Sequence, residues 1–293
     1  MNRVAAIDIG TNSTRLLVAE KAGPVLKALE TGLTTTRLGE GIGGGKLSPA
    51  AMDRTARAIE QFRQTALGLG AGQVVAAATS AVRDAVNQKD FLELVRGVSG
   101  LQVRVLSGEE EAELSYRGVL SGLAVDPLSS AVMDVGGGST ELIWRQGELL
   151  RLSSVNAGAV RMTEGGLDEE AIMVLLAPAL GEVRRSPVQN LVGVGGTVTT
   201  LAAVDQELAV YEPQRVHGYS LTAARVNRMM DRLKKMDIEE RMHVPGLQPE
   251  RADIIVAGIA IVKTVMKGLG LDSILVSECD ILYGLVLKEV ETN

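Results

Sequence analysis

The chain has 293 residues, which is long enough for two domains of ordinary size. A net charge of −6 and an aromatic content of 2% argue against a broad basic surface or base-stacking platforms, so we expect no nucleic-acid partner. The single cysteine excludes an internal disulfide, and with two histidines it nearly excludes a zinc site. The longest apolar run, residues 254–262, is too short to span a bilayer, and the chain shows no targeting segment. We therefore expect a cytoplasmic protein without membrane association.

The first hundred residues alternate between strand and helix patterns. Apolar runs predict strands over 4–9, 16–20 and 25–29, and the glycine-dense stretch 34–45 predicts a mobile surface loop. Arg37 in that loop is either an anion contact or a solvated side chain. The sequence next predicts a helix over 48–69, a strand over 73–78, a short amphipathic helix over 91–98 and a strand over 103–106.

Arg83 is the first candidate for a ligand contact. It lies in the segment 79–87, just past the strand predicted over 73–78. An α/β fold places ligand contacts at this position, beyond the end of a buried strand. Pairing with the adjacent Asp84 is the competing interpretation, and periodicity alone does not separate the two.

Glu111 stands apart from its acidic neighbours. Ser107 and Glu110 form a capping box at the start of a predicted helix, which gives Glu110 a structural role. Glu111 has no such role, and it shares a helix face with Ser115 and Gly118. These small residues should leave room for a ligand, so Glu111 is a candidate functional residue. The alternative is an exposed glutamate on the helix surface.

A domain boundary is expected near residues 120–130, where an Asp-Pro pair breaks the chain. A strand–turn–strand pattern over 131–143 follows, and its turn holds three consecutive glycines whose N–H groups can face a small anion. Asp134 and Glu141 flank the turn. Carboxylates beside an anion site favour a bridging cation, and Mg²⁺ fits best. A glycine-rich hairpin with solvated carboxylates is the simpler alternative.

The same pattern occurs near the N-terminus, over residues 5–18. Asp134 lies 126 residues after Asp8, close to half of the chain, and the same offset relates the turn residues that follow. The repeat predicts two similar lobes that face each other across a cleft. Their two hairpins would then converge on one phosphate and metal site.

The second half continues with alternating elements. A third glycine turn, Gly195-Gly196-Thr197, opens a helix whose free N–H groups suit an anion, although close packing explains it almost as well. His217, in a predicted loop over 215–219, is either a phosphate contact or a structural histidine. The remaining predicted elements are strands over 149–155, 191–194 and 274–276 and helices over 158–164, 169–183 (interrupted at Pro178), 222–235, 251–267 and 281–290.

Five motifs resemble, in order, those of the exopolyphosphatase / guanosine pentaphosphate phosphohydrolase (Ppx/GppA) phosphatase family; they span 8–13, 79–87, 108–112, 134–141 and 195–197. The resemblance covers nearly the whole chain. It implies the α/β fold of the actin-like ATPase superfamily (ribonuclease H-like), with two duplicated lobes around a central cleft. The first lobe would comprise residues 1–122 with the C-terminal helix at about 281–293. The second would comprise 123–280, as in the short two-domain form of the family.

The resemblance also implies roles for individual residues. Glu111 matches the catalytic glutamate and would act as general base, while Asp8, Asp134 and Glu141 match the acids around Mg²⁺. Weaker assignments fall on Arg37, Arg215, His217 and Arg251. The residues that match the phosphate-binding positions are Asn12, Ser13, Arg15, Arg83, Gly136, Gly137, Gly138, Ser139 and Thr140.

The implied activity is Mg²⁺-dependent hydrolysis of the terminal phosphoanhydride of polyphosphate, with a monovalent cation such as K⁺ as a second candidate cofactor. Guanosine pentaphosphate, a substrate linked to the stringent response, is the alternative; scarce aromatics favour polyphosphate. A small-metabolite kinase of the same fold is more remote. A filament or chaperone subunit is the non-enzymatic alternative, and the sequence shows no exposed apolar segment to favour it. Homodimers are common in such families, so a homodimer is expected.

Overall fold

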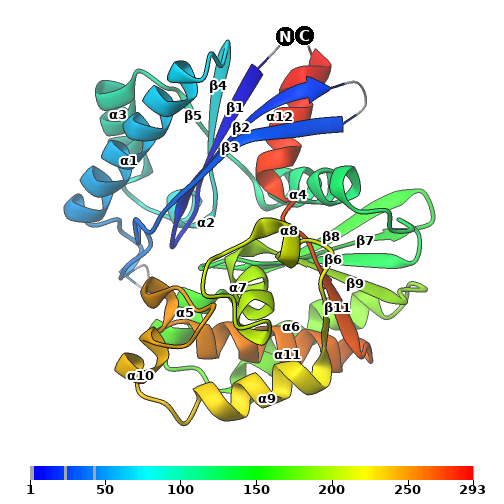
Figure 1. Cartoon of the computed structure of the whole chain (residues 1–293). Helices are drawn as coiled ribbons and strands as arrows, with labels where there is room; N and C mark the ends of the chain where they lie inside the picture. The colour runs from blue at the N-terminus through cyan, green and yellow to red at the C-terminus, as the bar shows by residue number, and fades with distance from the viewer. Residues whose placement is uncertain (1–2, 23–24, 42–43, 293) are drawn as a thin grey trace. The chain divides into compact units, whose positions relative to one another are not determined.

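The computed structural model describes residues 3–22, 25–41 and 44–292, so residues 42 and 43 of the predicted loop lie outside it. The chain divides into two compact units, coloured along the chain in Figure 1. Unit 1 comprises Met1–Ser121 and Asp280–Asn293, and unit 2 comprises Gly122–Cys279. No helix within the described ranges combines the length and the hydropathy that a membrane span requires.

Unit 1 is built on a five-stranded sheet in the order β3-β2-β1-β4-β5. The first three strands are antiparallel, and β4 and β5 run parallel to β1. Apolar side chains alternate along β1, so the sheet has two buried faces. Its strands are β1 (Arg3–Ile9), β2 (Thr14–Ala22), β3 (Val25–Thr34), β4 (Gln73–Ala78) and β5 (Val103–Val105).

Helices cover both faces of this sheet (Figure 1). One face packs against α1 and α3, and the other packs against α12, the last helix of the chain. The predicted cap of α1 is present, since the Ser48 hydroxyl accepts the N–H of Ala51 at 3.2 Å. The helices of unit 1 are α1 (Pro49–Gly68), α2 (Ser80–Arg83), α3 (Gln88–Ser99), α4 (Gly108–Gly122) and α12 (Ile281–Thr292).

Unit 2 is built on a six-stranded sheet in the order β10-β11-β9-β6-β7-β8. Strands β6, β7 and β8 form an antiparallel meander, β9 and β11 run parallel to β6, and β10 is an antiparallel edge strand. The strands are β6 (Ser130–Val135), β7 (Thr140–Gln146), β8 (Leu149–Val155), β9 (Asn190–Val194), β10 (Ser220–Thr222) and β11 (Ser273–Val276).

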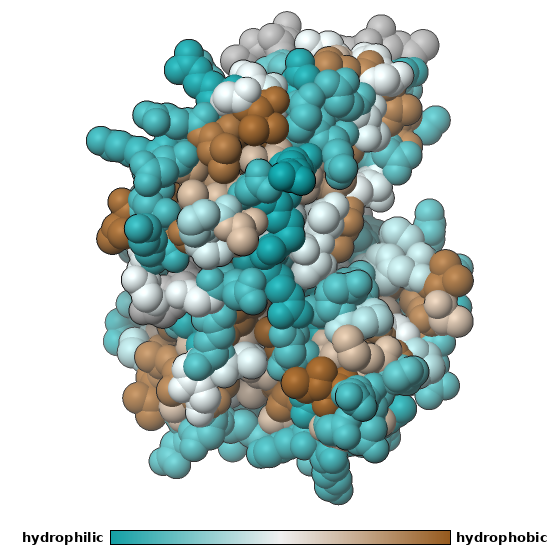
Figure 2. Space-filling view, turned by 90° about the vertical axis from the view of Figure 1, so that its left-hand side faces the viewer, coloured by the Kyte–Doolittle hydropathy of each residue, from teal (hydrophilic) through white to brown (hydrophobic). Residues whose placement is uncertain are grey.

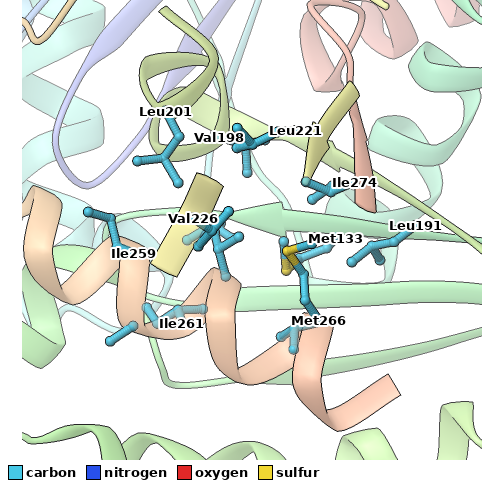
Figure 3. Packing of buried hydrophobic residues seen from close by; sticks show 14 of the residues in the cluster. Met133, Leu191, Val198, Leu201, Leu221, Val226, Ile259, Ile261, Met266 and Ile274 are labelled. Carbon is cyan, nitrogen blue, oxygen red and sulfur yellow. The ribbon is translucent and has the colours of Figure 1, made fainter. Parts of the chain in front are cut away.

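The main core of unit 2 lies between one face of this sheet and a layer of helices. Met133 and Leu191 of the sheet pack against α7, α9 and α11, as Figure 3 shows. The helices are α5 (Ala159–Glu164), α6 (Glu169–Val183), α7 (Gly195–Asp205), α8 (Pro213–Val216), α9 (Ala223–Leu233), α10 (Ile238–Met242), the 3₁₀ turn η2 (Pro249–Arg251) and α11 (Ile255–Leu269).

The two sheets share one topology, which confirms that the sequence repeat is a duplication of the fold. The order β8-β7-β6-β9-β11 in unit 2 matches β3-β2-β1-β4-β5 in unit 1, and β10 is the addition. The hairpin turns also match: the N–H of Gly10 donates to Ser13 O at 3.1 Å, and the N–H of Gly136 donates to Ser139 O at 3.0 Å. The repeated residues therefore occupy equivalent backbone positions.

One local prediction was wrong, and another was right only in part. Pro178 does not interrupt α6, because the buried side chains of Leu176 and Leu180 hold the helix against the core. Their burial offsets the roughly 3 kcal/mol that an interior proline costs. The predicted loop 215–219 is confirmed over residues 217–219, whereas Arg215 and Val216 form the end of α8. The pairing of Ser220–Thr222 with β11 was not visible in the local sequence.

The surface of the molecule is mixed rather than uniformly polar. On the face shown in Figure 2, hydrophobic residues lie in small patches between hydrophilic ones. In unit 2, apolar side chains of α6 and the preceding turn surround a hollow of about 480 Å³. The expectation that no apolar segment is exposed was therefore wrong. The exposed apolar residues there are Leu167, Met173, Val174 and Leu175.

Helices α4 and α12 approach each other closely at two glycines. A Cβ atom on Gly118 would lie 1.9 Å from the carbonyl oxygen of Asp280, and one on Gly284 would lie 2.0 Å from that of Leu114. Both obstacles are backbone atoms, which cannot move aside as a flexible side chain can. The absence of a side chain at these positions therefore sets the spacing of the two helices.

We predict that Gly284→Ala lowers the free energy of unfolding of unit 1 by roughly 1–3 kcal/mol, because the new methyl group overpacks the contact. Gly97→Ala is the matched control, since Gly97 lies in α3 with nothing within 4 Å of its Cβ position. That change should raise stability by about 0.5–1 kcal/mol. Denaturant unfolding followed by circular dichroism measures both. Equal effects of the two substitutions would contradict the packing argument.

Candidate functional site

Two carboxylates face each other across the hairpin of unit 2. Asp134 on β6 and Glu141 on β7 are direct cross-strand partners, so their side chains project from the same face of the sheet. Glu141 is buried, and its Oε1 accepts the Ser154 hydroxyl at 2.7 Å. Like charges directly opposite each other repel. A cation placed between them is therefore favourable, and carboxylate oxygens are the ligands that Mg²⁺ prefers.

The triple-glycine turn beside this pair is fastened by α5. Gly136 O accepts the N–H of Ala159, and Gly137 O accepts that of Val160, each at 2.9 Å. Arg161 adds a side-chain bond from Nε to Gly138 O at 2.8 Å. In a planar trans peptide the N–H points opposite to the C=O. The N–H groups of residues 137–139 therefore point away from α5, in an orientation suited to an anion.

The third glycine turn lies against the same hairpin. Gly195, at φ +88°, begins α7, and a Cβ atom there would lie 2.7 Å from Asp134 Oδ1. Only glycine allows both this conformation and this approach. A Cβ on the next residue, Gly196, would lie 2.2 Å from Nη2 of the buried Arg251. Unit 2 thus gathers Asp134, Glu141, two glycine turns and Arg251.

The hairpin of unit 1 carries an ion pair at the equivalent position. Asp8 and Arg15 are direct cross-strand partners, as Asp134 and Glu141 are in unit 2. Arg15 donates from Nη2 and Nε to Asp8 Oδ2, at 2.6 and 3.0 Å, and from Nη1 to Asp280. Burial raises the pKa of Asp8, Arg15 opposes that rise, and Asp280 adds to it.

The turn of the unit 1 hairpin is fastened by the glycine-dense loop. Gly39 donates its N–H to Thr11 O, and Arg37 donates to Asn12 O, both at 2.8 Å. Arg37 has the left-handed backbone conformation, at φ +46°. Asn12 and Ser13 are both buried, and Asn12 Nδ2 donates to Ser13 Oγ at 3.3 Å. The predicted phosphate-binding residues of this turn are therefore held in place.

Glu111 and Arg83 contact each other directly in unit 1. Nη1 of Arg83 donates to Glu111 Oε2 at 2.8 Å and to Leu106 O at 3.1 Å. Arg83 also lies beside Asp84, with Nε 3.7 Å from Oδ1. The sequence predicted the Asp84 pairing as an alternative, but it gave no sign of the shorter contact with Glu111. No local signal could have found it, because the two residues are 28 positions apart.

The glutamates at the start of α4 have different roles, as the sequence predicted. The capping box is confirmed: Ser107 Oγ accepts the N–H of Glu110 at 3.1 Å, and Glu110 Oε2 accepts that of Ser107 at 3.0 Å. The Ser107 amide and Arg104 together lower the pKa of Glu110. Glu111 is buried, whereas Glu109 is exposed. These contacts separate Glu111 from its capping neighbours.

The prediction that the helix face beside Glu111 is open to a ligand was wrong. Ser115 is fully buried, and the space beside Gly118 holds the backbone of Asp280. The small residues of α4 serve helix packing rather than ligand access. Sequence periodicity identified the face but not its occupant, because that occupant follows more than 150 residues later.

Two weaker candidates have structural partners. His217 bonds through Nε2 with Gly122 O and accepts the N–H of Glu278 at Nδ1, both at 3.1 Å. Arg215 is half exposed and pairs with Glu212 at 3.4 Å. Sequence reasoning did not single out Glu278, which also accepts the hydroxyl of Tyr211. These contacts favour the structural interpretation of His217.

The predicted metal-binding acids are distributed over both units: Asp8 belongs to unit 1, and Asp134 and Glu141 belong to unit 2. Within the described ranges, no cluster of three or more acidic, histidine or cysteine side chains forms a ready-made metal site. The Asp134–Glu141 pair still fits Mg²⁺, because this ion needs only one or two carboxylates when phosphate and water supply the other ligands.

Comparison with known proteins relates the chain to one family over nearly its whole length. The profile of the Ppx/GppA phosphatase family matches residues 16–293. Exopolyphosphatase 2 of Mycobacterium tuberculosis is 33% identical over 314 residues, which cover 98% of each chain. A Ppx/GppA family member from Aquifex aeolicus is 32% identical, with a TM-score of 0.82 and coverage of 99% and 98%. An exopolyphosphatase from Cytophaga hutchinsonii is 26% identical, with a TM-score of 0.90 and the same coverage.

Proposed function

Because the chain belongs to the Ppx/GppA phosphatase family, we propose that it is a Mg²⁺-dependent exopolyphosphatase. It has the duplicated α/β fold of the actin-like ATPase superfamily, as its motifs predicted. The reaction is hydrolysis of the terminal phosphoanhydride bond of inorganic polyphosphate. The name of the Mycobacterium tuberculosis relative, which spans the same length as this chain, supports this choice.

One observation carries the proposal: the facing carboxylates of Asp134 and Glu141 lie beside a glycine turn whose amides are oriented for an anion. Hydrolysis of a phosphoanhydride requires positioning and charge neutralisation more than covalent chemistry. A solvated hairpin would have no need of a buried glutamate such as Glu141 at this position. The carboxylate pair suits the cation, and the amides of the glycine turn suit the phosphoryl group.

The proposed metal site uses Asp134 and Glu141, with Ser154 holding the Glu141 carboxylate in position. Mg²⁺, when bound, neutralises charge on the phosphoryl oxygens. The amides of residues 137–139 bind the terminal phosphoryl group, and Ser139 and Thr140 continue the turn. Thr140 Oγ1 donates to Ala157 O at 2.5 Å, which holds the turn rather than leaving the hydroxyl for substrate.

Glu111 is the proposed general base. It takes a proton from water as the water oxygen attacks the terminal phosphorus; the bond to the bridging oxygen breaks, and phosphate and a shortened chain leave. Arg83 holds one carboxylate oxygen of Glu111 and thereby orients the base. The assignment of Arg83 as a phosphate contact stays a prediction, as does that of Arg15, whose guanidinium is held by Asp8 and Asp280.

Guanosine pentaphosphate is the alternative substrate, and it would undergo the same bond cleavage. The scarcity of aromatic side chains, which stack on bases, favours polyphosphate. A K⁺ requirement, a cytoplasmic location, a homodimer and the predicted cleft between lobes stay predictions. The non-enzymatic alternative is a filament or chaperone subunit, and α6 exposes apolar residues that could contact another chain. Sedimentation would show whether the protein polymerises.

We predict that Glu111→Gln reduces the rate of phosphate release by roughly 10²–10⁴-fold, because the amide cannot accept the proton of water. The amide oxygen keeps an acceptor for Arg83, so the variant should fold normally. Glu109→Gln is the matched control, because Glu109 is an exposed neighbour on the same helix turn, and it should retain full activity. Near-normal turnover by Glu111→Gln would refute the assignment.

The substrate proposal predicts phosphate release from polyphosphate that stops when EDTA removes divalent ions and returns when Mg²⁺ is added. Release should be faster from polyphosphate than from guanosine pentaphosphate at equal concentration of terminal phosphate. A reversed preference would support the alternative substrate. If neither polyphosphate nor guanosine pentaphosphate is hydrolysed, and phosphate is transferred from ATP to a small acceptor, the result would instead support the kinase alternative.

A further inference from the structure

Arg15 engages Asp8 in an unusual way. An arginine fork normally binds a carboxylate with two parallel bonds, one to each oxygen. Here Nε and Nη2 both donate to the same oxygen, Asp8 Oδ2, at 3.0 and 2.6 Å. The third nitrogen, Nη1, donates to Asp280. Asp8 Oδ1 is buried and has no hydrogen-bond partner in the described part of the chain.

Asp280 is fixed by contacts that do not involve Arg15. Its Oδ1 accepts the N–H of Leu282 at 3.1 Å and so caps the start of α12. Its carbonyl oxygen accepts the N–H of Gly284 at 3.1 Å and occupies the space beside Gly118 of α4. The helix that it caps is packed on the sheet of unit 1. The Asp280 carboxylate therefore has little freedom to move.

Arg15 has the more adaptable side chain of the two. Its long side chain has many rotamers, whereas a buried aspartate that caps a helix has few. The side chain of Arg15 retains 23% exposure, against 5% for that of Asp280. The position of the guanidinium is thus set by Asp280. Without that acceptor, the fork would be free to turn and bind both oxygens of Asp8.

We infer that Asp280 is a positioning residue: by holding Nη1 of Arg15, it keeps Arg15 from bonding Asp8 Oδ1 and so leaves that oxygen as a ligand for the cation. No motif of the sequence analysis includes Asp280. The inference rests on the proposed function together with the family resemblance, which implies that Asp8 is one of the acids around Mg²⁺. It adds a residue that acts on Asp8 only through Arg15.

Asp280→Asn tests this role, because asparagine caps helices about as well as aspartate but has a single acceptor oxygen. That oxygen serves the cap, and the charge that holds Arg15 is lost. We expect Mg²⁺ affinity, measured by calorimetry with the metal alone, to fall by roughly 10–100-fold, as for other groups that orient a ligand. The Mg²⁺ concentration for half-maximal phosphate release should rise in parallel, with kcat at saturating Mg²⁺ changed much less.

Asp168→Asn is the matched control. Asp168 caps α6 in unit 2 through the N–H of Ala171 at 2.9 Å, so the substitution makes the same chemical change at a helix start away from Arg15. It should leave Mg²⁺ affinity unchanged. Asp280→Ser is a second test variant that keeps a capping hydroxyl and should show the same loss as Asp280→Asn. Thermal unfolding checks that each variant is folded.

The outcomes separate this inference from the proposed function. Wild-type protein that binds no Mg²⁺ would overturn both. Mg²⁺ binding by the wild type that is unchanged in Asp280→Asn would overturn the inference and leave the proposed function standing. Failure of both Asp280 variants to fold, although each keeps a cap, would show a purely structural role and would also overturn the inference.

Discussion

One cross-strand position occurs once in each half of the chain, and the residue there sets the charge of its hairpin. In both hairpins an aspartate on the first strand faces a charged residue on the second. Unit 1 has Arg15 there, and the pair is an internal ion pair. Unit 2 has Glu141, and the two like charges favour a cation between them. The duplicated hairpins have the same backbone arrangement. The residue opposite the aspartate, Arg15 or Glu141, determines whether the hairpin holds an internal ion pair or two like charges.

Each hairpin turn is held by a different element. The turn of unit 1 is bonded to the loop that carries Arg37, and the triple-glycine turn of unit 2 is bonded to the start of α5. In the second case three backbone N–H groups and the side chain of Arg161 donate to the turn's carbonyl groups. Amides that are oriented before a ligand arrives stabilise it without the cost of reorganisation. The proposed anion site of unit 2 thus consists of backbone amides that the start of α5 holds in place.

Much of this was accessible from the sequence, because its signals are local or periodic. The constant offset between Asp8 and Asp134 predicted the duplicated topology, and the spacing of Ser107 and Glu110 predicted the cap that sets Glu111 apart. The predicted interruption of the helix at Pro178 was wrong, because core packing along α6 outweighs the low helix propensity of this one residue.

What the sequence did not reveal depends on contacts between distant segments. Arg83 meets Glu111 across 28 positions, and Arg15 meets Asp280 across 265. The small face of α4 looked open because the segment that fills it follows much later in the chain. Hydrophobic periodicity identifies a buried face but carries no information about which segment covers it.

In the proposed function, the negative charge opposite Asp134 is what makes the hairpin of unit 2 a cation site. Replacing Glu141 by arginine copies the Asp8–Arg15 pair of unit 1 onto the hairpin of unit 2 at the same register. Calorimetric titration of the folded Glu141→Arg protein with Mg²⁺ tests the claim directly. We expect that Mg²⁺ binding is lost while the fold is retained. Mg²⁺ binding with the affinity of the wild type would contradict it.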